Sequence, residues 1–467
     1  MPPEKCPYCN KQVNPEWRFC KHCNKPLIVN LKVSEKYTDS EKTEGFAVTN
    51  THQGNLFRTF DSESKDKLNA LEDQIEGNLQ KLEPIGSLLL EKAGIYYNNR
   101  DFSNSLKILK EALEAFQEEK NRLKIAITHN QIGLILEEKG FYDEAIYHFD
   151  DSLKILKQLQ ENAKLIKVYN NIANAYYLIQ DIEQAYSYYK KALNLAKKED
   201  LMDDVIKTNS NLAEILIILN QFEEADQRLQ QNLRYFQNTN EIYGMVNTYN
   251  KLGKLYFLKN TRDYETSISF LNKALNLIEQ IQEKISPYMK AELEWESYFY
   301  LGKTYLKKQE IKKAENHLFL SLDAVRTYHP RESINEALVL ETLAKVYEIK
   351  EEFSKSIEYY TLANKIFSKF GQDEKKAKGT YKIGQIYLEL SKLDKALRKF
   401  ENALQLYEEL EYIKQVADIH HAIGKIYLKE NLVDLAISSF REAQHYYKEI
   451  QDVYHVDLLK EKINSLK

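Results

Sequence analysis

The stretch from Ala173 to Ala192, ANAYYLIQDIEQAYSYYKKA, decides the fold of this chain of 467 residues. Counted from Ala173, a tyrosine, an alanine, an aromatic residue and an alanine follow at offsets of three, twelve, sixteen and nineteen: Tyr176, Ala185, Tyr189 and Ala192. Apolar residues recur every three or four positions on both sides of the polar break Gln180-Asp181. This pattern predicts two helices joined by a short turn.

The same pattern returns about every forty residues along the chain. Its small residue recurs at Ala93, Gly133, Ala173, Ala213, Gly253, Gly302, Ala344, Gly384 and Gly424. Each unit is too short to bury its own apolar face, so it must stack on its neighbours. The chain has only 14 Gly and 8 Pro and almost no period-two alternation. We therefore expect an all-α fold, a superhelical solenoid of antiparallel helix pairs.

The small–Tyr–Ala–aromatic–Ala signature resembles that of the tetratricopeptide repeat (TPR), and it recurs nine times between roughly Ser87 and Ile450. The forty-residue period exceeds the usual TPR length of about 34 residues. In this respect the array resembles the TPR regions of the Pins/LGN proteins and of kinesin light chains. The resemblance implies a groove that binds a peptide segment of a partner protein.

Composition and charge exclude several classes of function. The formal net charge is only −4, which argues against wholesale electrostatic capture by nucleic acid or membrane. No apolar run is long enough to span a membrane, and the first residues lack the apolar stretch of a signal peptide, so we expect a cytoplasmic protein. No Gly-rich phosphate loop, HExxH motif or nucleophile elbow is present, so we predict no enzymatic activity.

All four cysteines form two Cys-x-x-Cys pairs with ten residues between them: Cys6, Cys9, Cys20 and Cys23. Four thiolates at this spacing suit one tetrahedral Zn²⁺. About 25 residues cannot build a core, so the metal would supply the folding free energy of this segment. The segment resembles the short zinc ribbons at the ends of many bacterial and archaeal proteins. We predict one structural Zn²⁺, because a redox dithiol needs a helix start beside a strand and a catalytic zinc needs an open coordination position.

The sequence on either side of the repeats predicts further segments of the chain. We expect a zinc ribbon over 1–28, a flexible linker over 29–65, an N-terminal capping helix over 66–84, nine repeats over 85–451 and a C-terminal capping helix over 452–467. The regular spacing fails after the fifth repeat, where Ser286-Pro287 precedes a long first helix. A hinge and an indifferent loop insertion explain this irregularity equally well.

Helical offsets from the small residue predict which side chains line the concave wall of the array. They are Asn130, Asn170, Asn174, Asn247, Asn250, Lys254, Lys303, Lys345 and Lys425. Side-chain amides both donate to and accept from a peptide backbone, and a row of lysines would attract acidic side chains or a carboxylate. Glu341 and Glu348 interrupt this positive field. The alternative is that all these residues are ordinary polar groups on an exposed helix face.

These features predict a non-enzymatic scaffold or adaptor that binds a protein or peptide, which the lysine row would make an acidic one. The zinc ribbon would be a second contact, because two linked weak sites raise the effective affinity. The alternative is a regulatory protein whose zinc ribbon binds nucleic acid while the array senses a protein or peptide.

Overall fold

A computed structural model describes residues 62–81, 84–259, 263–328 and 332–466. The four cysteines, the predicted zinc ribbon over 1–28 and residues 29–61 of the predicted linker lie outside the described residues.

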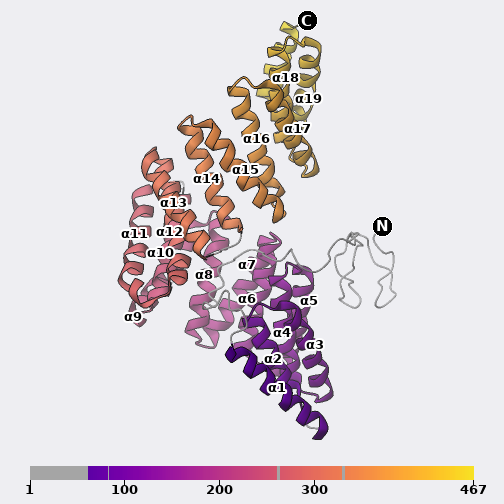
Figure 1. The fold of residues 1–467 in the computed structure, drawn as a ribbon, viewed down its shortest axis with the longest axis vertical. Coiled ribbons are helices and arrows are strands. Elements are labelled where there is room, and N and C mark those ends of the chain that lie inside the picture. Colours follow the sequence, from indigo (N-terminus) through magenta and orange to yellow (C-terminus); the bar gives the residue numbers. More distant parts are fainter. Residues whose placement is uncertain (1–61, 82–83, 260–262, 329–331, 467) are drawn as a thin grey trace, which may run out of the picture. The chain divides into compact units, whose positions relative to one another are not determined.

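The described residues form twenty α-helices and one short 3-10 helix, without a strand among them (Figure 1). The helices are α1 (Ser62–Lys81), α2 (Gly86–Asn98), α3 (Phe102–Glu118), α4 (Arg122–Glu138), α5 (Tyr142–Leu159), α6 (Asn162–Leu178), α7 (Ile182–Lys198), α8 (Met202–Ile218), α9 (Phe222–Thr239), α10 (Ile242–Leu258), α11 (Tyr264–Ile281), α12 (Pro287–Lys307), α13 (Ile311–Tyr328), α14 (Ile334–Ile349), α15 (Phe353–Lys369), α16 (Asp373–Glu389), α17 (Leu393–Glu409), α18 (Ile413–Lys429), α19 (Val433–Glu449) and α20 (Val453–Ser465). The all-α prediction is confirmed for this part of the chain.

Consecutive helices pair into hairpins, and the hairpins belong to two compact units, Met1–Glu241 and Ile242–Lys467. The described part of the first unit contains four hairpins, from α2–α3 to α8–α9. The second unit contains five, from α10–α11 to α18–α19. Within each unit successive hairpins stack, so each unit is an α-solenoid with its own thin core.

The small residue of the signature lies where the two helices of a hairpin touch. A Cβ atom added to Gly384 would lie 2.9 Å from Cδ1 of Phe400, and one added to Gly424 would lie 2.5 Å from Cε1 of Phe440. Both phenylalanines are buried. The offset of sixteen residues in the sequence signature is therefore a direct contact between a small residue and a large one across the hairpin.

A serine at offset twelve keeps this close approach where the usual alanine is missing. The buried hydroxyl of Ser105 donates to the carbonyl of Ala93 at 2.8 Å, and Ser356 donates to the carbonyl of Ala344 at 2.9 Å. A buried hydroxyl without a partner would destabilise the fold. The serine repeats therefore depart from the signature in sequence but keep its geometry.

The predicted polar breaks are tight turns closed by a left-handed residue. Gln180 has φ 63° and Ser391 has φ 55°. The next amides, of Asp181 and Lys392, donate at 2.9 Å to carbonyls five residues back, which is the Schellman pattern that satisfies the last groups of a helix. The Asp181 carboxylate then caps α7 by accepting from the amide of Gln184.

Flanking helices bury apolar residues at both ends of the array. On α1, Leu68 and Leu71 are buried, whereas Leu79 is exposed. On α20, Leu459 and Ile463 are buried against the last hairpin. The irregular spacing after the fifth repeat reflects a 3-10 helix at Gln282–Lys284 and the unusual length of α12, which has 21 residues.

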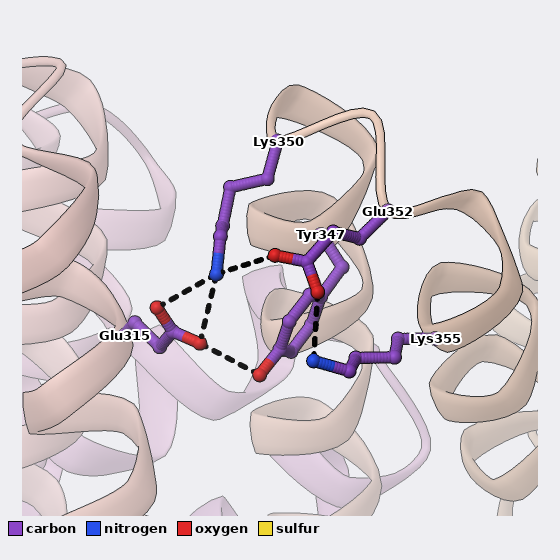
Figure 2. A network of polar contacts seen from close by, with 5 residues as sticks. All are labelled: Glu315, Tyr347, Lys350, Glu352 and Lys355. Carbon is purple, nitrogen blue, oxygen red and sulfur yellow. Dashed lines mark hydrogen bonds and ion pairs between the residues drawn. The ribbon is translucent and has the colours of Figure 1, made fainter.

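A polar network joins two successive hairpins of the second unit (Figure 2). The carboxylate of Glu315 on α13 accepts from the hydroxyl of Tyr347 on α14 at 2.6 Å and pairs with Lys350 at 3.1 Å. Glu352 pairs with both Lys350 and Lys355, at 2.8 and 2.7 Å. Burial, and then the bond to Glu315, raise the pKa of Tyr347 above its ordinary value. Tyr347, the tyrosine of its repeat signature, therefore packs in the core and also hydrogen-bonds to the preceding hairpin.

Candidate functional site

A groove of about 720 Å³ opens in the second unit. The first helices of four successive hairpins, α10, α12, α14 and α16, supply most of its wall. The lining residues are Phe257, Lys303, Leu306, Lys307, Gln309, Thr342, Lys345, Glu348, Ile349, Glu351, Phe353, Lys382 and Glu389. The groove therefore lies on the helices that the repeat signature predicts for the concave wall.

Lys303 on α12 has the most unusual surroundings in this groove. Its Nζ atom lies 5.0 Å from the ring centres of Phe257 and Phe299 and 5.2 Å from that of Tyr300. Among the described residues, no carboxylate lies within ion-pair distance of this atom. Burial, and then the charge of Lys345, lower the pKa of Lys303 to about 8. Aromatic rings thus partly replace water around this ammonium group, which forms no ion pair with any described carboxylate.

Two other groove lysines are already paired with carboxylates. Lys345 lies 2.5 Å from Oε1 of Glu341, and Lys382 lies 3.2 Å from Oε1 of Glu348. The second oxygen of Glu348 accepts from the hydroxyl of Tyr360 at 3.0 Å. Glu341 therefore neutralises Lys345 of the lysine row, and Glu348 neutralises Lys382, a groove lysine of α16 outside that row.

Three of the four predicted lysines lie at or near the groove, and the fourth lies away from it. Lys303 and Lys345 line the groove. Lys254 on α10 is half-buried, and its charge contributes to lowering the pKa of Lys303, so it lies in the same electrostatic neighbourhood. Lys425 on α18 is exposed and does not line the groove.

Three of the predicted groove asparagines are buried instead of exposed. Asn170 donates to Thr208 Oγ1 of α8 at 3.0 Å. Asn250 donates to the carbonyl of Leu293 on α12 at 3.3 Å and accepts from Ser297 at 2.5 Å. Asn174 accepts from the hydroxyl of Tyr189. The expectation that these amides face an open groove is corrected, because a neighbouring helix covers each of them and uses its hydrogen bonds.

The other two predicted asparagines are half-buried. Asn130 on α4 accepts from the amide of Asn171 on α6 at 2.9 Å, which again joins two first helices. Asn247 lies on α10 outside the set that lines the groove. Asn130, Asn170 and Asn250 thus join successive first helices through their side-chain amides.

Sequence reasoning missed the apolar part of the groove. Phe257 and Leu306 each lie four residues after a small signature residue, one helical turn beyond the offset of the lysine row. Lys382 lies two residues before Gly384. The offset of four residues identifies Phe257 and Leu306 from sequence alone.

A second polar cluster lies in the first unit, between α4 and α5. Nδ1 of His129 and Nδ1 of His148 are 2.9 Å apart, and the ring centres are 5.2 Å apart. One ring must donate and the other accept, so the contact suits two neutral rings and is broken by a second Nδ1 proton. Burial is the main cause that lowers the pKa of both rings, that of His148 to about 4. The same two offsets hold Tyr169 and Tyr188 in the next hairpin.

This pair predicts an acid-sensitive first unit. The histidines of the unfolded chain take up protons near pH 6.5, whereas the folded rings resist protonation, so the free energy of unfolding falls as the pH drops from about 6.5 towards 4. Allowing for partial exposure, we expect the pair to contribute about 1–2 kcal/mol of this loss.

Urea unfolding at pH 7 and pH 5 measures the effect. The control is the double variant His129→Tyr/His148→Tyr, which copies the third hairpin and should show a smaller pH dependence. An equal loss of stability in both proteins would contradict this role of the histidine pair.

The described residues contain neither a metal-binding cluster nor a membrane-spanning helix. Within 62–81, 84–259, 263–328 and 332–466, no group of three or more His, Cys, Asp or Glu side chains is arranged to hold a metal ion. In the same part of the chain, no helix combines the length and the apolar character needed to cross a membrane.

Comparison with known families identifies the class of repeat. Residues 85–158 and 124–198 match a tetratricopeptide repeat model, and residues 246–281 match another tetratricopeptide repeat model. Residues 340–466 match the model of the soluble NSF attachment protein, SNAP. Tetratricopeptide repeats are therefore present over residues 85–198 and 246–281, as the signature predicts.

Particular relatives are distant. Protein KINESIN LIGHT CHAIN-RELATED 1 of Arabidopsis thaliana is 27% identical over 109 residues, which are 23% of this chain and only 18% of that protein. A signal transduction ATPase with numerous domains (STAND) with a tetratricopeptide repeat sensor, from Pyrococcus horikoshii, has a TM-score of 0.54 at 15% identity, over 80% of this chain and 55% of that one. The apo form of the quorum sensor NprR from B. thuringiensis has a TM-score of 0.52 at 17% identity, over 74% of this chain and 97% of that one. These structural likenesses concern the fold alone.

Proposed function

We propose that this chain is a non-enzymatic cytoplasmic adaptor that binds an acidic peptide segment of a partner protein in the groove of the second unit. One observation carries the proposal: the groove crosses four successive first helices, and the ammonium group of Lys303 at its α12 side has no counter-ion in the part of the chain that the structure describes. A carboxylate of a ligand would supply the missing charge. An ion pair in a partly desolvated site is stronger than one in open water.

The shape and the apolar residues of the groove favour an extended segment over a compact ligand. Phe257, Leu306, Ile349 and Phe353 offer apolar surface, and Ile349 is 48% exposed. Apolar side chains of a peptide would cover this surface, while its acidic group contacts Lys303 and Lys307 on α12. Linear ligands of this kind suit a site built from parallel first helices.

Charge reversal tests the proposal. Peptides are first selected from a random peptide library on the full chain, and their affinities are then measured by fluorescence anisotropy. We expect Lys303→Glu to weaken the selected peptides about tenfold or more, because it places a carboxylate against the acidic group of the ligand. Lys425→Glu is the matched control, since Lys425 occupies the same repeat offset on α18 outside the groove.

Comparing the two variants shows whether the peptides bind in the groove or elsewhere on the surface. Loss of affinity in Lys303→Glu with little change in Lys425→Glu supports the proposed site. An equal effect of both substitutions would show that the net charge of the protein matters and the groove does not. Acidic peptides should also lose affinity between pH 7 and pH 9, because Lys303 deprotonates with a pKa of about 8 in the free protein.

The zinc ribbon completes the proposal as the second contact. Residues 1–28 would be held by one Zn²⁺ on Cys6, Cys9, Cys20 and Cys23, and a linker of about 37 residues would allow both sites to engage one partner. The alternative, a regulator whose zinc ribbon binds nucleic acid, rests on the basic residues of this segment, such as Lys11, Arg18 and Lys21. Nuclease treatment separates the two, because only the alternative loses its ligand.

A further inference from the structure

Lys303 differs from the other groove lysines in ways that concern reactivity as well as binding. Lys345 and Lys382 are held in ion pairs, and Lys307 is exposed at the end of the same helix. Lys303 is half-buried, has three aromatic rings around its amine and has no carboxylate partner among the described residues. An amine in an apolar pocket without a counter-ion is the arrangement that makes a lysine nucleophilic.

We propose that Lys303 is an acylation site, which takes an acyl group from an activated donor with an anionic leaving group, of the acyl phosphate class. The donor has access, because Lys303 lines an open groove of about 720 Å³. The ammonium group of Lys307 lies on the same groove wall and would attract the phosphate of the donor. The rings of Phe257 and Phe299 offer an apolar surface beside the carbonyl carbon that is attacked.

The step balances without an oxidant or a cofactor. The lone pair of the unprotonated Lys303 amine attacks the carbonyl carbon of the acyl phosphate, so that a C–N bond forms and the C–O bond to phosphate breaks. The nitrogen loses one proton to water, and the products are an amide on Lys303 and inorganic phosphate. Burial lowers the pKa of this amine to about 8, so roughly a tenth of it is unprotonated at pH 7.

Acylation would change what the groove can bind. The amide of acyl-lysine is neutral, so the α12 side of the groove would lose the cation that has no counter-ion. A neutral group also sits more easily among Phe257, Phe299 and Tyr300 than an ammonium does, because no charge is desolvated. The reaction itself needs no bound peptide, so it can be tested whether or not the groove binds a partner.

The test uses acetyl phosphate on the full-length protein. Acetylation of each lysine is quantified by mass spectrometry at early times, at half-unit steps from pH 6.5 to pH 9.5. We expect Lys303 to react about tenfold faster than Lys307 at pH 7.5, since burial lowers the pKa of the Lys303 amine to about 8. Its rate should level off above about pH 8, whereas the rate of a lysine with ordinary pKa continues to rise tenfold per pH unit.

Lys307 is the internal control for reagent concentration, because it lines the same groove one helical turn away. Phe257→Ala removes one of the three rings around the Lys303 amine and should lower its acetylation rate severalfold at pH 7.5. Phe257→Leu keeps an apolar side chain at this position and should restore most of that rate. Circular dichroism confirms that both variants remain folded. Equal acetylation rates of Lys303 and Lys307 across the pH range would overturn the proposal. So would an acetylation rate of Lys303 that is unchanged in the Phe257→Ala variant.

Discussion

Replacing Phe400 by alanine should lower the free energy of unfolding of the second unit by about 3–5 kcal/mol. Phe400 on α17 is fully buried, and its ring fills the space beside Gly384, where even one added Cβ would lie 2.9 Å away. Alanine would leave a cavity that the backbone of α16 and α17 cannot close without losing the contacts of Ala396 and Ala403. Urea unfolding followed by far-UV circular dichroism measures the change.

The array itself supplies the controls for this experiment. Leucine occupies the same place beside Gly253 and Gly302, as Leu271 and Leu318, so Phe400→Leu should cost only about 1–1.5 kcal/mol. Arg398→Ala, on the exposed side of the same helix, should change the stability by less than about 0.5 kcal/mol. A loss of less than about 1 kcal/mol in Phe400→Ala would show that the signature aromatic is not a main support of the hairpin.

Removing two cysteines should abolish zinc binding completely. We expect the full chain to carry one Zn²⁺, and Cys6→Ser/Cys20→Ser to carry none, because two remaining thiolates cannot complete a structural tetrahedron. The helical signal should not change, since the described helices contain no cysteine. Elemental analysis of protein purified in the presence of zinc gives the stoichiometry, and circular dichroism gives the helical content.

His22 provides the control for this prediction. It lies between Cys20 and Cys23, and His22→Ala should keep one zinc per chain because four thiolates already fill the coordination sphere. Full-length protein without stoichiometric zinc would rule out the ribbon, and retention of zinc by the double cysteine variant would place the metal elsewhere.

The amino-acid sequence by itself determined the repeat and the contacts inside each hairpin. The offset between Gly384 and Phe400 is a contact because both positions lie in one hairpin, where helical geometry links sequence spacing to distance. The turns at Gln180 and Ser391 were predictable for the same reason, since local hydrogen bonds close them. Such features depend on residues that are close in sequence, and the signature encodes all of them.

Only the tertiary structure decided which side chains meet a ligand, because this depends on how each hairpin is covered by the next. Asn170 and Asn250 have the offsets of groove residues, yet both are buried and each donates a hydrogen bond to the following first helix. Lys303 and Lys425 share one offset, but only Lys303 has the ring of Phe257, from the preceding hairpin, over its amine. Contacts between hairpins join residues some thirty to fifty positions apart, as Glu315–Tyr347 and Asn250–Leu293 do. The burial that these contacts produce depends on the stacking of hairpins, which the spacing inside one repeat does not encode.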